Sequence, residues 1–200
     1  MDNLILKIND LKNSEISKVI KNRMDEFSSI HDENLFSELC FCLMTANFRA
    51  DKCIEIQEAL GEGIDNLSEK NLAEVLKSSG HRFWPQRAER IVLARKHKNE
   101  LPKIRNESDR KWLVKNVKGL GMKEASHFLR NVGVKDLAII DFHIVDLLVS
   151  EGLMGKPKSM SIGKYLEIEN ILKEIGKKVK LNLAELDLYL WYLETGKILK

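Results

Sequence analysis

Apolar residues recur at intervals of three and four along most of the chain, and strict alternation of apolar and polar residues is almost absent. The first spacing is typical of amphipathic helices and the second of half-buried strands, so the pattern predicts an all-α protein. Glycines and prolines mark the expected helix ends. The expected helices cover residues 14–27, 33–46, 51–60, 69–78, 85–98, 108–117, 122–131, 142–151, 164–175 and 181–194.

The segment 111–131 combines a short helical stretch, the turn Gly119-Leu120-Gly121 and a second amphipathic helix. Glycine tolerates positive φ and has no side chain, so such a turn can be tight and let a phosphate approach the backbone. The helix that follows begins with unpaired N–H groups and the positive end of a helix dipole, which together favour an anion. We therefore predict a helix-hairpin-helix that binds DNA phosphates through the backbone at Val117, Gly119 and Gly121 without reading sequence.

Lys123 lies in the first turn of the second helix, where a cation is unfavourable against the helix dipole and the neutral, nucleophilic amine is favoured. Asp141 follows 18 residues later, at the end of the apolar run 137–140. A buried carboxylate needs a partner. Asp141 could cap the next helix, accept the proton of Lys123 or stabilise positive charge on a sugar. Taken alone, Lys123 would be interpreted as a surface lysine and Asp141 as a helix cap. Only their combination, in this order after the glycine turn, indicates a catalytic site.

This segment resembles the helix-hairpin-helix DNA glycosylases whose motif ends in a Gly/Pro-rich loop and an aspartate. It looks most like the archaeal-type, second-class 8-oxoguanine DNA glycosylase/AP lyases, and the resemblance covers essentially the whole chain. It rests on GLGMKEASHFLRNVG (119–133), AIIDFHI (138–144), ELCFCLMTANF (38–48), GHRFWPQRAERIVLAR (80–95), KYLEIENIL (164–172) and ELDLYLWYLETGKILK (185–200). One departure is Phe142, where the family usually has arginine. We expect its loss to remove a surface or phosphate contact and to leave the role of Asp141 intact.

The resemblance implies a two-lobed helix-hairpin-helix glycosylase fold with a DNA cleft between the lobes. Residues 30–134 would form a central lobe that carries the hairpin and Lys123. Residues 1–29 and 135–200 would form the second lobe, so that Asp141 falls at the junction, where substrate sites tend to lie.

The resemblance also implies a bifunctional repair enzyme that acts on double-stranded DNA as a monomer. The 8-oxoguanine would be flipped out of the duplex, Lys123 would attack the sugar C1′ with the help of Asp141, and the Schiff base would lead to β-elimination. This chemistry needs no metal and no organic cofactor. A glycosylase for another oxidised base and a non-catalytic DNA-binding module are the alternatives. The second requires neither Lys123 nor Asp141.

Two further clusters are candidate DNA contacts. Arg82 and Phe83 lie in a turn between helices, where an aromatic wedge with an adjacent arginine would refill the gap left by a flipped base. Phe83 could instead form a hydrophobic staple onto the helix that begins at Pro85. The resemblance implies that Lys200, the last residue, reaches the damaged base and that Trp191 offers a stacking face. Plain core packing is the alternative for Trp191.

The basic residues are unevenly distributed. Between Lys77 and Arg130 the chain has 15 Lys and Arg against 5 Asp and Glu, a net charge of +10, whereas the remainder carries −7. This asymmetry favours a polyanionic partner, with a lysine-rich solvated surface as the alternative. His143 is expected to contact a phosphate or to be structural, and His127 to be structural. Arg130 could contact a phosphate or be a surface charge.

Three cysteines, an odd number, argue against a disulfide framework, and Cys40 and Cys42 lie in an apolar run that should bury them. No cysteine follows Cys53, which excludes the four-cysteine iron–sulfur cluster of some glycosylases. The histidines lack metal-ligand spacing. The chain has no run of 18 apolar residues and no signal-peptide pattern, so we expect no membrane association and a cytoplasmic, nucleoid-associated protein.

Overall fold

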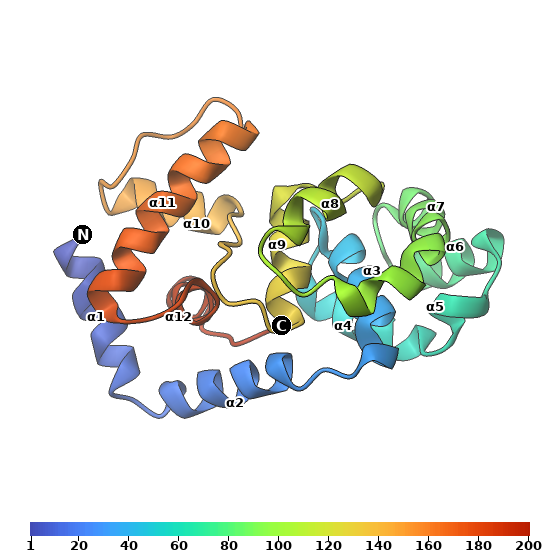
Figure 1. Cartoon of the computed structure of the whole chain (residues 1–200), viewed down its shortest axis with the longest axis horizontal. Helices are drawn as coiled ribbons and strands as arrows, with labels where there is room; N and C mark the ends of the chain where they lie inside the picture. The colour runs from blue at the N-terminus through green and yellow to red at the C-terminus, as the bar shows by residue number, and fades with distance from the viewer. The chain divides into compact units, whose positions relative to one another are not determined.

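The computed structural model describes residues 1–200, which form twelve α-helices, two 3-10 helices and no strand (Figure 1). The all-α expectation is therefore confirmed. The chain divides into two compact units. The terminal unit consists of Met1–Ser29 and Gly133–Lys200, and the central unit is Ile30–Val132.

The central unit is built around one buried helix. Its helices are η1 (Asp32–Asn34), α3 (Leu35–Thr45), α4 (Ala50–Leu60), α5 (Gly63–Asn66), α6 (Glu69–Ser78), α7 (Trp84–Ala94), η2 (Arg95–Lys103), α8 (Asp109–Asn116) and α9 (Met122–Asn131). Helix α3 packs against α4, α7, α9 and η2. Every residue of α3 except Ser37 is buried, as expected for a helix that is apolar all round. Its Cys40 and Cys42 are fully buried free thiols, as predicted.

The terminal unit surrounds a second apolar helix. Its helices are α1 (Asp2–Lys12), α2 (Ile16–Ser28), α10 (Phe142–Ser150), α11 (Ile162–Val179) and α12 (Leu183–Thr195). Helix α12 contacts the other four, and six of its residues are buried. The first residues of α11 and α12 are held by side-chain caps, in which Ser161 accepts the Lys164 amide and Asn182 accepts the Glu185 amide. These caps fix where two long helices of this unit begin.

Several helix boundaries differ from the sequence prediction. Helix α1 was not predicted, although Leu4 and Ile8, four residues apart, are fully buried against this unit. The expected helix 85–98 ends at Ala94, and the chain continues as the 3-10 helix η2, which contains Pro102. Pro102 has no amide hydrogen to donate and lies in the last turn of η2, so it marks the end of this helical segment. The short helix α5 was also missed, because four residues leave no periodicity to detect.

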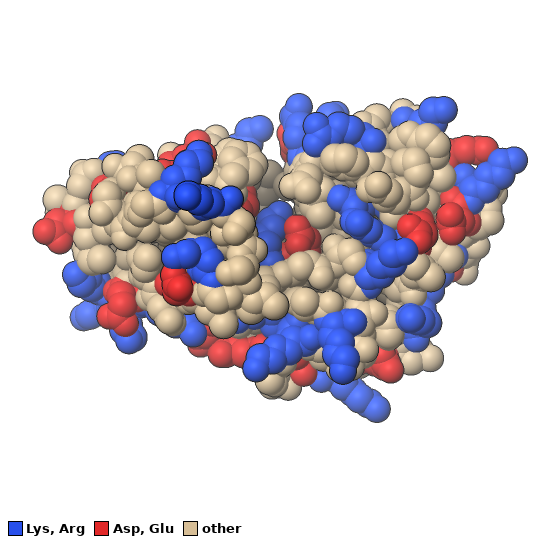
Figure 2. Space-filling view, turned by 90° about the horizontal axis from the view of Figure 1, so that it is seen from above, with Lys and Arg blue, Asp and Glu red and all other residues tan.

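The surface carries charges of both signs. Figure 2 shows one face of the protein, on which blue Lys and Arg side chains lie among red Asp and Glu side chains. Three of the basic residues counted between Lys77 and Arg130 are buried, namely Arg87, Arg110 and Arg130. The exposed positive charge of this segment is therefore smaller than its sequence indicates. No helix combines the length and apolarity that a bilayer crossing requires.

Candidate active site

A tight turn joins α8 to α9 and gives the hairpin its shape. The Leu120 amide donates to the Val117 carbonyl at 3.1 Å, and Gly119 has a φ of 98°. A Cβ atom at Gly119 would lie 2.4 Å from Cδ of Arg90. The positive φ therefore favours glycine at this position, and any side chain here would also have to displace Arg90. Gly121 differs, because its φ of −94° is open to any residue and it serves as the N-cap of α9.

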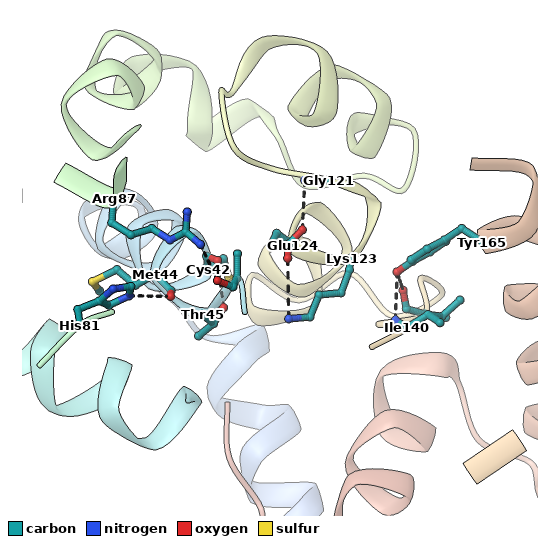
Figure 3. Close-up of polar contacts among 12 residues, drawn as sticks. Cys42, Met44, Thr45, His81, Arg87, Gly121, Lys123, Glu124, Ile140 and Tyr165 are labelled. Carbon is teal, nitrogen blue, oxygen red and sulfur yellow. Dashed lines mark hydrogen bonds and ion pairs between the residues drawn. The ribbon is translucent and has the colours of Figure 1, made fainter. Parts of the chain in front are cut away.

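Lys123 is the second residue of α9 and is only partly exposed, with 23% of its side chain accessible. Its Nζ atom lies 3.9 Å from Oε1 of Glu124, as Figure 3 shows. The other oxygen of Glu124 accepts the Gly121 amide at 3.2 Å. A DNA phosphate at the Gly121 amide would therefore compete with Glu124. The sequence prediction missed Glu124, although an acidic residue three positions after a helix N-cap is a recognisable capping signal.

A buried thiol and a buried guanidinium lie in the electrostatic neighbourhood of Lys123. Burial raises the pKa of Cys53 to about 12, against the opposing effect of the Arg87 and Lys123 charges. Arg87 is 3% exposed, and burial lowers its pKa from the ordinary value. Its Nη2 atom donates to the Ala46 carbonyl at 2.5 Å, while Nε and Nη1 have no partner. Arg87 therefore anchors the end of α3 (Figure 3).

The turn before α7 is fastened to the same end of α3. His81 donates from Nε2 to the Met44 carbonyl at 3.0 Å and accepts the Phe83 amide on Nδ1 at 3.1 Å. This pair of bonds requires the neutral ring with its proton on Nε2. Burial accordingly lowers the pKa of His81. The turn that carries the predicted wedge is thus held by contacts to a helix 37 residues earlier.

The two predicted wedge residues contact each other. Arg82 is exposed, donates to the Asn47 carbonyl at 3.3 Å and places its guanidinium carbon 4.5 Å from the centre of the Phe83 ring. The guanidinium of Arg87 lies 5.5 Å from the same ring. Phe83 is half-buried at the N-cap of α7. The wedge role stays a prediction.

Asp141 occupies the N-cap of α10. Its Oδ1 atom accepts the Ile144 amide at 3.0 Å, so the expected capping role is found. The four preceding residues, Leu137 to Ile140, are buried, whereas Asp141 itself is half-buried. Only Oδ1 takes part in the cap. The cap thus fixes the orientation of the carboxylate, and its chemical role stays a prediction.

Three aromatic rings adjoin the start of α10. Phe142 stacks on His143 with ring centres 3.9 Å apart, and the His143 ring meets Trp191 edge-on at 5.1 Å. Phe142 is 68% exposed, and the Nε1 atom of half-buried Trp191 has no hydrogen-bond partner. The terminal unit therefore brings Asp141, His143 and Trp191 together. Lys200 and the two residues before it are half-buried, in line with a tail that packs down.

The interpretation of Arg130 needs correction. The sequence left it as a phosphate contact or a surface charge, but it is 3% exposed near the end of α9. A side chain so deeply buried can serve in neither role in this structure. His127, one turn earlier, is 6% exposed and packs edge-on against Phe41 at 5.7 Å, which agrees with the structural role expected of it.

The family described as 8-oxoguanine DNA glycosylase matches this chain over residues 20–181. The chain belongs to this family. Two relatives, the 8-oxoguanine DNA glycosylase/AP lyases of Methanocaldococcus jannaschii and Korarchaeum cryptofilum, are each 53% identical to it. The alignments cover 98% and 100% of this chain and 99% of each relative.

Solved structures of the family have the same fold. The M. jannaschii 8-oxoguanine glycosylase/lyase, in complex with a 15mer DNA containing 8-oxoguanine, matches with a TM-score of 0.95 at 51% identity, over 98% of this chain and 99% of that one. The Thermotoga maritima 8-oxoguanine DNA glycosylase matches with a TM-score of 0.94 at 39% identity, over 100% and 99%. The helix-hairpin-helix glycosylase fold predicted from the sequence is confirmed.

Proposed function

We propose that the chain is a bifunctional DNA repair enzyme, which excises 8-oxoguanine from duplex DNA and then cleaves the strand at the abasic site. Family membership and the activity named for its relatives support the proposal. The observation that carries it is Lys123, an amine shielded from bulk water at the start of α9, directly after a turn that favours glycine. Phosphate binding alone does not call for a half-buried amine at this place.

Lys123 is the proposed nucleophile. Its neutral amine attacks C1′ of the damaged nucleotide, and the bond between C1′ and the base nitrogen breaks. The electron pair of that bond leaves with the base, which takes up a proton. The amine then opens the sugar ring and forms a protonated Schiff base.

The Schiff base prepares strand cleavage. The positively charged imine withdraws electrons from C2′, so a base can remove a C2′ proton. The electrons of that C–H bond form a C2′–C3′ double bond and expel the 3′-phosphate. Hydrolysis of the imine releases Lys123 for another cycle. No step needs a metal or an organic cofactor.

Asp141 is the proposed carboxylate partner of this chemistry. It accepts a proton from the Lys123 amine or stabilises positive charge that develops on the sugar. Lys123 belongs to the central unit and Asp141 to the terminal unit, so their joint action is a proposal about the enzyme on DNA. The cap formed by Oδ1 supports it, because a fixed carboxylate loses little freedom when substrate binds.

The remaining candidate residues would bind DNA and the lesion. The backbone at Val117, Gly119 and Gly121 and the side chain of His143 would contact phosphates, while Arg82 and Phe83 would fill the space left by the flipped base. Lys200 and Trp191 would contact 8-oxoguanine. A monomer suffices, since one chain carries every proposed residue, and the enzyme would be found with DNA in the nucleoid.

Reductive trapping tests the proposal directly. Borohydride is added to the enzyme with a duplex that carries one 8-oxoguanine, and in parallel with the undamaged duplex. With the lesion duplex, the enzyme should yield a covalent adduct of one protein chain and one DNA strand, identified by its mass. The Lys123→Gln variant should yield no adduct. Base release without any adduct would mean a monofunctional glycosylase. Equal reaction with other oxidised bases, in a panel of matched duplexes, would contradict the assignment of 8-oxoguanine as the substrate.

A further inference from the structure

The buried segment that leads to Asp141 has an unusual backbone environment. Residues 137–140 are buried and adopt no helix, and the protein has no strand that could pair with them. Backbone amide and carbonyl groups in such a segment are costly unless they find hydrogen-bond partners. The segment therefore depends on side chains from elsewhere in the fold.

Two side chains of α11 supply these partners. The Tyr165 hydroxyl donates to the Ala138 carbonyl at 2.7 Å and accepts the Ile140 amide at 3.2 Å (Figure 3). One helical turn later, Oε2 of Glu169 accepts the Ala138 amide at 3.0 Å. Tyr165 and Glu169 are 2% and 3% exposed, so water competes little for these bonds. Together they satisfy both backbone groups of Ala138 and the amide of Ile140, residues that lie two apart as those bonded by a neighbouring strand do.

We propose that Tyr165 and Glu169 are positioning residues for the Asp141 carboxylate, an inference that rests on the proposed catalytic role of Asp141. Ile140, whose amide Tyr165 holds, directly precedes Asp141 in the chain. The Ile144 amide holds the carboxylate from the other side. The acid is thus fixed by the backbone before it and by the helix after it. Catalysis is sensitive to displacements of an ångström, so loss of one support should slow the reaction.

Tyr165→Phe separates the hydrogen bonds of the hydroxyl from the packing of the ring. The phenylalanine fills the same space but leaves the Ala138 carbonyl and the Ile140 amide without the hydroxyl. We expect the single-turnover rate of base excision to fall by about 10- to 100-fold. The dissociation constant for lesion DNA should change by less than about threefold, because no DNA contact is removed.

Tyr189→Phe is the matched control. Tyr189 is also buried, at 4% exposure, but it lies on α12 and makes no bond to residues 137–141. The excision rate of the Tyr189→Phe variant should stay within about twofold of the wild-type rate, as expected for a neutral substitution. Thermal unfolding of both variants reports any general loss of stability. Equal excision rates for the two variants would overturn the proposal.

A double variant separates positioning from general structural support. If Tyr165 acts through the Asp141 carboxylate, Tyr165→Phe should lower the residual rate of Asp141→Asn by less than about twofold, because the two effects are not additive. The same 10- to 100-fold loss in both backgrounds would show only a structural role and would overturn the inference. Full activity of Asp141→Asn alone would instead contradict the proposed function, and the inference would fall with it.

Glu169 provides an independent pair of variants. Glu169→Gln keeps an oxygen that can accept the Ala138 amide, whereas Glu169→Leu removes the acceptor. We expect Glu169→Gln to retain most of the excision rate and Glu169→Leu to lose about as much as Tyr165→Phe, about 10-fold or more. If both variants slow excision equally, with equal losses of stability, the hydrogen bond does not position the acid and the proposal fails for Glu169.

Discussion

The hairpin around Lys123 and the segment before Asp141 hold their functional residues in different ways. In the hairpin, the supporting bonds join neighbours along the chain, from Leu120 to Val117 and from Gly121 to Glu124. Before Asp141, the bonds come from α11, where Tyr165 and Glu169 lie 25 to 31 residues further along the chain.

This difference has consequences for stability and for function. The hydrogen bonds that support the hairpin join residues only three positions apart in the chain. The hairpin can therefore keep its shape as long as its own sequence is intact. The backbone before Asp141 keeps its shape only while α11 stays packed against it, so its geometry depends on the fold of the whole terminal unit. Variants within the hairpin should therefore act locally, whereas variants on α11 should act at a distance on Asp141.

The largest effect should come from removing the proposed nucleophile of the hairpin, Lys123. Lys123→Gln should lower the excision rate by about 10³-fold or more and remove the borohydride adduct, because no other amine occupies its place. Lys118→Gln is the control. Lys118 is exposed and pairs with Glu89 at 2.6 Å, so its loss should leave the excision rate unchanged. The slope of log binding constant against log salt concentration should become less steep by at most about one. Unchanged excision by Lys123→Gln would mean that the hairpin binds DNA but does not supply the nucleophile.

The next effect should come from the charge of Asp141. Asparagine is as good a helix cap as aspartate, so Asp141→Asn preserves the bond to the Ile144 amide and removes only the negative charge. We expect excision to slow by about 10²-fold or more with little change in thermal stability. Asp146→Asn, in the same helix and exposed beside Lys156, should retain the wild-type rate. Equal rates for the two variants would leave Asp141 as a cap alone.

A smaller effect should follow from a change in the hairpin backbone. Gly119→Ala forces a side chain into a positive φ and displaces Arg90, which should lower stability by about 1 kcal/mol or more. DNA affinity should fall about 10-fold if the turn binds a phosphate, since 1.4 kcal/mol corresponds to a factor of ten. Gly155→Ala, in a loop with open space around it, is the control. Normal affinity in Gly119→Ala would argue against phosphate binding at this turn.

The smallest effect should be a pH dependence in the central unit, where His81 is held over a distance as Asp141 is. Burial lowers the pKa of His81 in the folded protein, so the unfolded chain takes up a proton at a higher pH than the folded one. Stability should therefore be constant above about pH 6.5 and fall as the pH drops below it, until the folded ring also takes up a proton. His81→Gln, which keeps a donor and an acceptor, should flatten this dependence in urea unfolding experiments across this pH range. If the free energy of unfolding of His81→Gln varies with pH as steeply as that of the wild type, a group other than His81 causes the dependence.

The two regions also explain which parts of the site could be predicted. The turn, the N-terminus of α9 and Lys123 were predicted because their signals lie within a few residues and follow from backbone chemistry. The cap formed by Asp141 was one of the three roles that the sequence left open for this residue, and it was recognisable for the same reason. Tyr165 and Glu169 were not, because nothing in their own helix distinguishes a tyrosine that bonds a distant backbone from one that fills a core.

Burial set a similar limit elsewhere. Arg87 and Arg130 were counted as part of a basic segment, since charge is read from the sequence without knowledge of depth. In the structure both are buried, and Arg87 anchors the carbonyl end of α3. Helix α1 was missed although it has 11 residues and Leu4 and Ile8 carry the helical spacing, so this miss is an oversight of a pattern that the sequence did contain.

The amino-acid sequence by itself determined the all-α class, the family and the hairpin, and it supplied the prediction that Lys123 and Asp141 react together, because these follow from periodicity, glycine turns and short motifs. Only the tertiary structure decided which polar groups are buried and which distant side chains support them. The physical reason is that a hydrogen bond to a buried backbone group depends on where the chain returns in space, and this position is set by packing rather than by neighbouring residues.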